Sequence, residues 1–478
     1  MHPPLLTTTF LLSLSLLLPL TTSTTTTPAI HLPLSRRNGS FLSSSSIANL
    51  TSLTQTLHET STRFLATERR VADSHVIRIP RRHYSNILYP PGTTPLEPSA
   101  FLLGEVGREG GWFVSMQLGE GEREVEMDLG FLSGDFVFVD TGGEGSTGFI
   151  EGKILGLRGC RRVEDILRIG ERGIGVEVEF AVCRPSRSWV GGLGRSGGLI
   201  GLAGGEGLRQ VGGKGNGFLG ELQRAGVLDE RGGGGGVWSV VLINGREGVW
   251  SIGGTAEEIV REIEEEIEGE LERLEGDDGL KREEKAVSDG DRWEWVRVQG
   301  TDGWWQIMMK SIYVSGTKVL QNQQVILDLN TPFIIGPPSA VRTLYASISG
   351  ARALPPPYSH FYTYPCFNPS EIHFEFGSFR TAVMKGAGDK GAFSPGGRFS
   401  LGRAERGSGF CVGMVVEGVF AELGEGNGMQ DVWVLGEPFF RDVQVAFDVC
   451  SFVYGWLILV SDDLVEGEES RNAESLTL

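Results

Sequence analysis

Apolar and polar residues alternate in short runs along most of the chain beyond residue 108. Typical runs are WFVSMQL, VEVEFAV, VWSVVLI and VWSIGG, and glycine-rich turns separate them. A period of two residues is that of a strand with one buried face, and many short strands with glycine between them are typical of sandwiches and barrels. We therefore expect an all-β body with a large core beyond residue 108.

One segment, residues 256–294, departs from this pattern. Its apolar residues recur at helical spacing on an acidic background: Ile259, Ile263, Ile267, Leu271 and Leu274. The spacing predicts an amphipathic helical insertion. We expect a solvated insertion that packs one stripe onto the body, and the less favoured alternative is a lid or partner-binding element.

The two ends of the chain differ from the body in composition. Residues 1–29 combine a short polar start with an apolar run and a small residue, Ala29, which predicts a cleaved signal peptide. Residues 30–107 contain the dibasic pairs 69–70 and 81–82 and predict a removable propeptide, with glycan acceptor sites at Asn38 and Asn49. Residues 463–478 are expected to be a disordered tail. These features predict a zymogen that is secreted or vacuolar.

Charge and composition exclude several function classes. The chain of 478 residues has a formal net charge of −18, which repels phosphate backbones and argues against nucleic acid as a partner. No segment beyond the leader reaches the roughly 18 apolar residues that a membrane helix needs. We expect a monomer without cofactor or metal.

The sequence offers few candidate residues for a nucleophilic active site or for a metal site. Only His360 and His373 lie outside the predicted leader and propeptide, so a serine or cysteine nucleophile with a histidine base is improbable. The segment GLGRSG at 192–197 fits a dinucleotide-binding pattern and GRSGG at 194–198 a nucleophile-elbow pattern. Glycine supplies 70 of 478 residues, so both are treated as chance matches.

Two aspartates, each at the end of an apolar or alternating run, are the strongest catalytic candidates. They are Asp128 in EVEMDLG and Asp328 in QVILDLN, and 328 − 128 = 200 residues separate them. Two carboxylates held about 3 Å apart share a proton, so that one activates water while the other acts as an acid. A literal Asp-Thr-Gly at Asp140 is the second choice for the first aspartate.

Several segments in the right order resemble the pepsin-like aspartic peptidases (peptidase A1), as a divergent member. The longest is VWVLGEPFFRDVQVAFDV at 432–449, and GGLIGLAG ending at residue 204 is similar to its counterpart in a first lobe. GWWQIMMKSIYV before Asp328, GPPSAVRTLYASI after it, and YPCFNPSEIHFEFG are similar to parts of a second lobe.

The resemblance implies a bilobal fold of two six-stranded-type β lobes with a cleft between them, at 108–255 and 295–462. It implies a catalytic pair of Asp128 and Asp328, supported by Gly130 and Thr331, and a disulfide between Cys366 and Cys411. Of the other three cysteines, Cys160 and Cys183 are the most plausible pair, which would leave Cys450 free.

The catalytic motif also departs from the family pattern. Leu129 and Leu329 stand where each motif normally has a hydroxyl, Asn330 stands where the second motif has glycine, and Phe131 replaces a supporting serine. The tyrosine that the family carries over its cleft is absent, since no tyrosine occurs between Tyr89 and Tyr313. Two hypotheses remain. The first is an acid endopeptidase that acts on a peptide or protein substrate, and the second is a catalytically inactive protein of this fold that binds peptides or a secreted partner.

Overall fold

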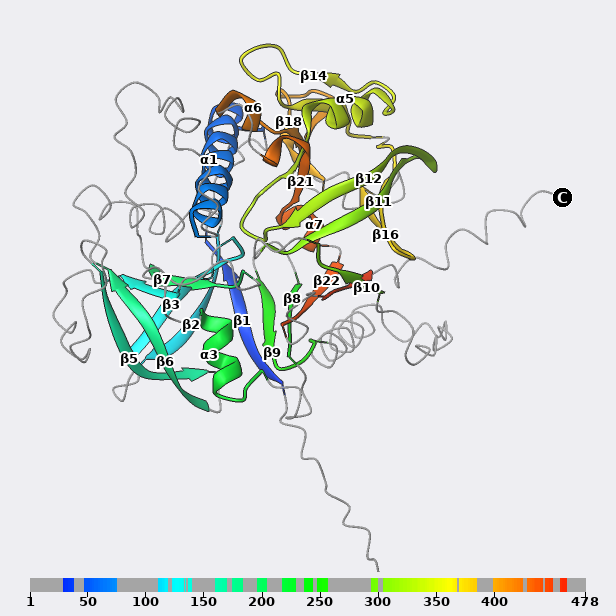
Figure 1. The fold of residues 1–478 in the computed structure, drawn as a ribbon. Coiled ribbons are helices and arrows are strands. Elements are labelled where there is room, and N and C mark those ends of the chain that lie inside the picture. The colour runs from blue at the N-terminus through cyan, green and yellow to red at the C-terminus, as the bar shows by residue number, and fades with distance from the viewer. Residues whose placement is uncertain are drawn as a thin grey trace, which may run out of the picture.

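The computed structural model describes the following residues, to which every structural statement below refers: 29–37, 47–74, 111–118, 123–132, 134, 136–139, 160–169, 174–183, 196–203, 217–228, 236–243, 247–256, 294–299, 304–367, 369–384, 399–423, 428–441, 443–449 and 456–461. The described residues form mainly strands in two lobes (Figure 1), which confirms the expected all-β class. The predicted tail, all of the predicted leader except Ala29, and nearly all of the acidic insertion lie outside them.

A closed ring of strands forms the first lobe. The strands β2, β3, β7, β4, β6 and β5 pair in that order, and β5 pairs back onto β2. Their bounds are β2 Trp112–Leu118, β3 Arg123–Gly130, β4 Phe136–Val139, β5 Cys160–Ile169, β6 Ile174–Cys183 and β7 Ser196–Gly201. Buried side chains alternate along β5 and β6, and the helix α3 (Phe218–Arg224) packs against β6 and β7. The ring therefore encloses an apolar interior.

The second lobe contains two sheets. One has the order β17-β16-β11-β12-β21-β13-β20, and the other has the order β14-β15-β19-β18. Their bounds are β11 Gln306–Val314, β12 Thr317–Leu327, β13 Ile334–Gly336, β14 Arg352–Ala353, β15 Tyr362–Pro365, β16 Ile372–Phe376, β17 Phe379–Met384, β18 Ser400–Arg403, β19 Phe410–Gly413, β20 Val415–Glu417 and β21 Val432–Leu435. Short helices connect them: α5 Pro338–Ala346, α6 Phe420–Leu423, η5 Gly428–Asp431 and α7 Glu437–Phe440.

A six-stranded section joins the lobes. Its order is β10-β23-β22-β8-β9-β1, and β1 continues the sheet into the first-lobe ring by pairing with β2. The bounds are β1 Ile30–Arg36, β8 Val237–Leu242, β9 Glu247–Ile252, β10 Glu294–Arg297, β22 Val443–Asp448 and β23 Trp456–Ser461. Strands from the beginning, middle and end of the chain thus lie in one sheet. The N-terminal strand β1 is the sixth of the 12 strands in the full sheet, between β9 and β2.

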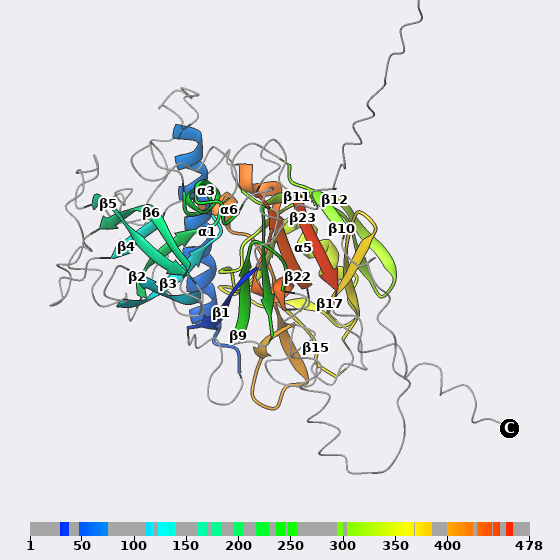
Figure 2. The same cartoon turned by 90° about the horizontal axis from the view of Figure 1, so that it is seen from below.

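The helix α1 (Leu50–Ser74) crosses the junction of the two lobes (Figures 1 and 2). It begins where the Asn49 side chain accepts a hydrogen bond from the Ser52 N–H at 3.2 Å, which satisfies a backbone donor of the first turn. Leu53, Leu57 and Phe64 are fully buried in a cluster that includes residues of both lobes. Burial of this apolar stripe holds the helix in place.

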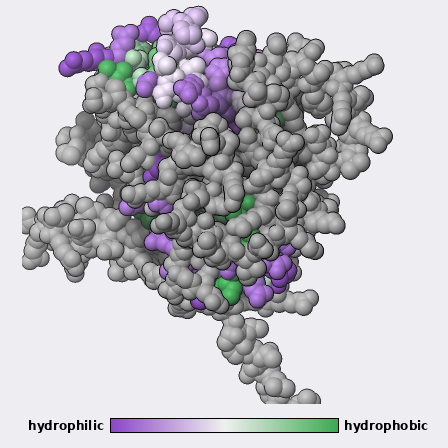
Figure 3. Space-filling view, turned by 90° about the vertical axis from the view of Figure 1, so that its left-hand side faces the viewer, coloured by the Kyte–Doolittle hydropathy of each residue, from purple (hydrophilic) through white to green (hydrophobic). Residues whose placement is uncertain are grey.

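The exposed surface of the described part is polar where the space-filling view colours it. On the face presented, most coloured residues are hydrophilic and the hydrophobic areas are small (Figure 3). The large apolar side chains exposed among the described residues are Ile243, Trp295 and Phe367. Among the described helices, none has the length and apolar character required to cross a membrane.

Candidate active site

Asp328 follows β12 directly and is 1% exposed. The Thr331 hydroxyl donates to its Oδ2 at 2.5 Å, and the Asn330 backbone N–H donates to its Oδ1 at 3.3 Å. Its own N–H donates to the Leu435 carbonyl of β21 at 3.1 Å. Thr331 therefore lies against Asp328, as the resemblance implies, and the loop fixes the direction of the carboxylate.

Arg63 of α1 contacts this carboxylate from the N-terminal part of the chain. Its guanidinium donates to Asp328 Oδ2 and, at 3.0 Å, to the Thr331 hydroxyl. The Arg63 side chain is only 7% exposed, so both charges are withdrawn from water and compensate each other. Helix α1 thus places a cation on Asp328.

Asp128 lies within β3 and is also 1% exposed. Arg37, which follows β1, donates from Nε to Asp128 Oδ1 at 2.9 Å and from Nη1 to Glu126 Oε2 at 2.9 Å. The guanidinium also lies over the Phe113 ring, 4.4 Å from its centroid. Asp128 and Asp328 are therefore each paired with a different arginine, and both arginines come from residues 30–74.

The two lobes repeat one arrangement of strands. In the first, β3 lies parallel to β7, β7 antiparallel to β4, and β4 parallel to β6. In the second, β12 lies parallel to β21, β21 antiparallel to β13, and β13 parallel to β20. The central strand β7 ends in Leu-Ile-Gly, and β21 ends in Val-Leu and is followed directly by Gly436. The repeat allows residues to be equated by register.

This register places Gly130, rather than Asp128, at the position equivalent to Asp328. Ile200 of β7 pairs with Leu129 and Phe136, and Leu435 of β21 pairs with Leu327 and Ile334. The intervals agree, since 136 − 129 = 7 and 334 − 327 = 7. Leu129 and Leu327 are therefore equivalent, and the residues that follow them are Gly130 and Asp328.

Asp128 and Asp328 thus do not occupy equivalent positions in strand register, and their role as a catalytic pair stays a prediction. The tripeptides Asp-Leu-Gly and Asp-Leu-Asn look alike in sequence, but β3 continues two residues beyond Asp128, whereas β12 ends before Asp328. Two residues of strand span about 6.6 Å, which is longer than a hydrogen bond. Phe131 accordingly takes the place of Leu329, packed edge-on against Trp238, Phe440 and Phe447.

The loop at Asp328 is joined to the first lobe by the side chain of Asn330. Its Oδ1 accepts from the Trp112 N–H at 3.1 Å, and its Nδ2 donates to the Leu129 carbonyl. Leu129 and Leu329 are fully buried apolar residues. Sequence reasoning recognised Asn330 only as a departure from glycine, and missed Arg37 and Arg63, because their partners are distant along the chain. Asp140, the second choice, lies outside the described residues.

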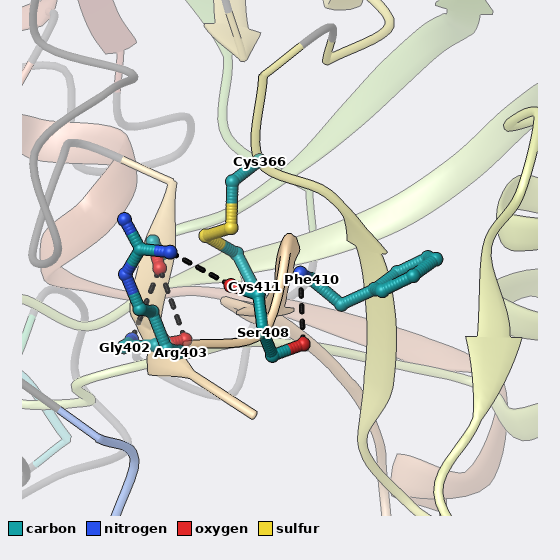
Figure 4. The surroundings of a disulfide bond; sticks show 7 residues. Cys366, Gly402, Arg403, Ser408, Phe410 and Cys411 are labelled. Atoms are coloured by element: carbon teal, nitrogen blue, oxygen red, sulfur yellow. Dashed lines mark hydrogen bonds between the residues drawn. A yellow bond between two sulfur atoms is a disulfide. The ribbon is translucent and has the colours of Figure 1, made fainter. Parts of the chain in front are cut away.

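The cysteines of the second lobe form the expected disulfide. Cys366 and Cys411 are joined with an S–S distance of 2.04 Å across 45 residues of sequence (Figure 4). Hydrogen bonds beside it, including one from Arg403 to the Ser408 carbonyl at 2.7 Å, order the same turn. In the first lobe, the backbones of Cys160 and Cys183 lie directly opposite each other on β5 and β6. Their disulfide stays a prediction.

The fold and site define an all-β protein of two lobes with the strand repeat of a pepsin-like body. Residues 285–452 match the family described as eukaryotic aspartyl protease, which confirms the resemblance to the pepsin-like aspartic peptidases. The match covers the second lobe and β22, and it supports a function of aspartic-protease type in general. No curated protein matches the chain.

Proposed function

We propose that this protein is a non-hydrolysing member of the pepsin-like fold, which holds a peptide at the junction of its lobes, against Asp328. The observation that carries the proposal is the glycine at position 130, in strand register with Asp328. Hydrolysis of the aspartic type requires two carboxylates close enough to share a proton. With Gly130 in one of the two places, the second lobe supplies a carboxylate that has no equivalent in the first.

The N-terminal segment supports the peptide-binding part of the proposal. Part of the chain already occupies the junction, where Arg63 contacts Asp328 and Thr331 and the neighbouring Phe64 packs edge-on against Trp304 and Phe420. We propose that residues 30–107 act as a removable propeptide, and that α1 covers the peptide site until it is displaced. A disulfide is typical of oxidising compartments, which supports our proposal of a secreted or vacuolar protein.

The second candidate is an acid endopeptidase that uses Asp128 and Asp328. The family match favours it, and so does the pairing of both buried aspartates with arginines of residues 30–74. Removal of that segment would withdraw both arginines, and this candidate then uses the two carboxylates as acid and base. This candidate requires Asp128 to approach the position of Gly130.

One experiment separates the two candidates. The purified full chain is cut at the dibasic pairs 69–70 and 81–82 by an added protease, because a non-hydrolysing protein cannot release its own N-terminal segment. The protease is then removed, and a fluorescein-labelled unfolded protein is added between about pH 3 and 6. Fluorescence anisotropy measures binding, and release of small fragments, with and without a statine-type inhibitor, measures cleavage. The variants are Asp328→Ala, Asp128→Ala and, as a matched control, Asp431→Ala, which removes an exposed carboxylate of the same lobe.

We expect binding without cleavage, and a loss of at least fivefold in affinity for Asp328→Ala but not for Asp431→Ala. Inhibitor-sensitive cleavage that disappears in both Asp128→Ala and Asp328→Ala would overturn the binding proposal in favour of the endopeptidase. Absence of both binding and cleavage, from a folded protein that has lost its N-terminal segment, would reject both candidates.

A further inference from the structure

The side chain of Asn330 bridges the two lobes at the point where they meet beside Asp328. Asn330 is 7% exposed and belongs to the loop after β12. Its amide nitrogen donates to the Leu129 carbonyl of β3, and its amide oxygen accepts from the Trp112 N–H of β2. Both ends of the side chain are thus used on the main chain of the opposite lobe.

The two backbone groups are neighbours at the end of one ladder. Phe113 of β2 pairs with Asp128 of β3, so the next residues along the two strands are Trp112 and Leu129. Trp112 offers its N–H as a donor, and Leu129 offers its carbonyl as an acceptor. A carboxamide presents one acceptor and one donor group on a short stem, so a single side chain satisfies both strands. The ladder end lies next to Gly130.

The same residue also orients Asp328. The Asn330 backbone N–H donates to Asp328 Oδ1 at 3.3 Å, while its side chain holds the loop against the first lobe. The neighbouring positions offer no such tie, because Leu129 and Leu329 are apolar and fully buried. In the first lobe, the register equivalent of Asn330 is Leu132, also buried, so the tie runs in one direction only, from the second lobe to the first.

We propose that Asn330 is an inter-lobe lock: a positioning residue that fixes the Asp328 loop to the ends of β2 and β3, and thereby fixes the spacing of the lobes at the peptide site. The lock does not depend on whether the protein binds or hydrolyses its peptide. It is not the only inter-lobe hydrogen bond, since the Trp305 indole donates to the Leu202 carbonyl at 2.7 Å. Its loss is therefore expected to loosen the ladder end without separating the lobes.

Hydrogen exchange of the full chain tests the lock, read by mass spectrometry on peptides that cover 111–118 and 123–132. Asn330→Ala removes both contacts and is expected to raise exchange of the Trp112 amide at least tenfold. Gln323→Ala is the matched control, because Gln323 uses its amide within the second lobe, accepting from the Trp433 indole at 3.0 Å. It is expected to leave exchange at Trp112 unchanged.

Asn330→Asp tests the lock through the pH dependence of exchange at the Trp112 amide, which a merely structural role of Asn330 would not change. An ionised carboxylate could still accept from the Trp112 N–H, but it repels the Leu129 carbonyl and the neighbouring Asp328 carboxylate, and is expected to turn away from both strands. A protonated carboxyl can donate to the Leu129 carbonyl and accept from Trp112, as the amide does. We expect fast exchange at the Trp112 amide near pH 7, relative to the original chain at the same pH, and recovery of protection below about pH 4. Unchanged Trp112 exchange in Asn330→Ala, or an Asn330→Asp effect that does not vary with pH, would overturn the proposal.

Discussion

The two lobes share an arrangement of strands but have diverged at the residues that meet between them. In the second lobe, the loop after β12 carries Asp328, which Thr331 and the Asn330 backbone hold in place. In the first lobe, Gly130 and Leu132 stand at the register positions of Asp328 and Asn330. The two lobes therefore share an arrangement of strands but differ in the residues at these two positions.

The difference shows that strand pairing and site chemistry are under separate constraints. Leu129 and Leu327 are both buried, and each pairs with an apolar residue of the central strand of its lobe. Such packing tolerates any sequence of suitable volume and pattern. A water-activating pair, in contrast, needs two carboxylates in one place, so a change at either position would affect the shared proton without disturbing the strand pairing.

The largest effect that we predict tests whether Asp328 and Asp128 contribute unequally to the free energy of unfolding. Asp328→Ala leaves Arg63 buried without its carboxylate and is expected to lower the free energy of unfolding by about 3–5 kcal/mol. Asp128→Ala is expected to cost less, because Arg37 keeps Glu126 as a partner at 2.9 Å. Urea denaturation at neutral pH measures both losses. Equal losses would contradict the inequality of the two sites.

A slightly smaller effect tests whether both lobes are crosslinked. The Cys366–Cys411 disulfide closes 45 residues, for which chain entropy gives about 4 kcal/mol. A Cys160–Cys183 bond would close 183 − 160 = 23 residues, for which the same relation gives about 3.5 kcal/mol. We expect peptide mapping without reductant to find both pairs, and the double replacements by serine to lose stability in that order. A free thiol at Cys160 would rule out the Cys160–Cys183 pair.

The sequence predicts most of the fold, because the patterns that define it are local. The alternating run VEVEFAV lies in β6, most of VWSVVLI forms β8, and VWVL forms β21, which the glycine follows directly. The disulfide follows from the resemblance of the segments that contain Cys366 and Cys411. These features depend on residues that are close together in the sequence, so the sequence alone is enough to predict them.

The site is predicted only in part, because its contacts are long-range. Arg37 and Arg63 meet aspartates 91 and 265 residues away, and no local pattern marks them. The likeness of the tripeptides at Asp128 and Asp328 concealed their different places in strand register. One signal in the sequence was available: the interval from Leu129 to Phe136 equals that from Leu327 to Ile334.

A third prediction concerns the residue that follows Gly201 at the end of β7 and the residue that follows Gly436, directly after β21. The first lobe has the buried apolar Leu202 there, whereas the second has Glu437, which is 1% exposed and paired with Arg36 and Arg441, each at 2.7 Å. Arg36→Ala removes one partner and is expected to cost about 1–3 kcal/mol. Arg342→Ala, which removes a 59% exposed partner of Glu417, is the control and is expected to cost at most about 1 kcal/mol. Equal losses in thermal unfolding would show that Glu437 does not depend on β1.

The smallest effect concerns an acid-sensitive contact on the outer strands of the second lobe. Burial tends to raise the pKa of Glu375, but hydrogen bonds from Lys310 at 2.9 Å and from the Tyr313 hydroxyl at 2.8 Å outweigh it, so the pKa is lowered. A lowered pKa in the folded state contributes stability above the unfolded value of 4.5, and this contribution disappears as the pH falls through the folded value.

Glu375→Gln is therefore expected to melt about 1–2 °C below the original chain at pH 7, and to approach it at pH 3. Glu371→Gln, which replaces an exposed carboxylate beside the same strand, serves as the control and should show no such convergence. The measurement is the melting temperature across that pH range. A constant difference between Glu375→Gln and the original chain would mean that the side chain stabilises β16 by packing rather than by charge, and would leave the second lobe without an acid-sensitive contact at this position.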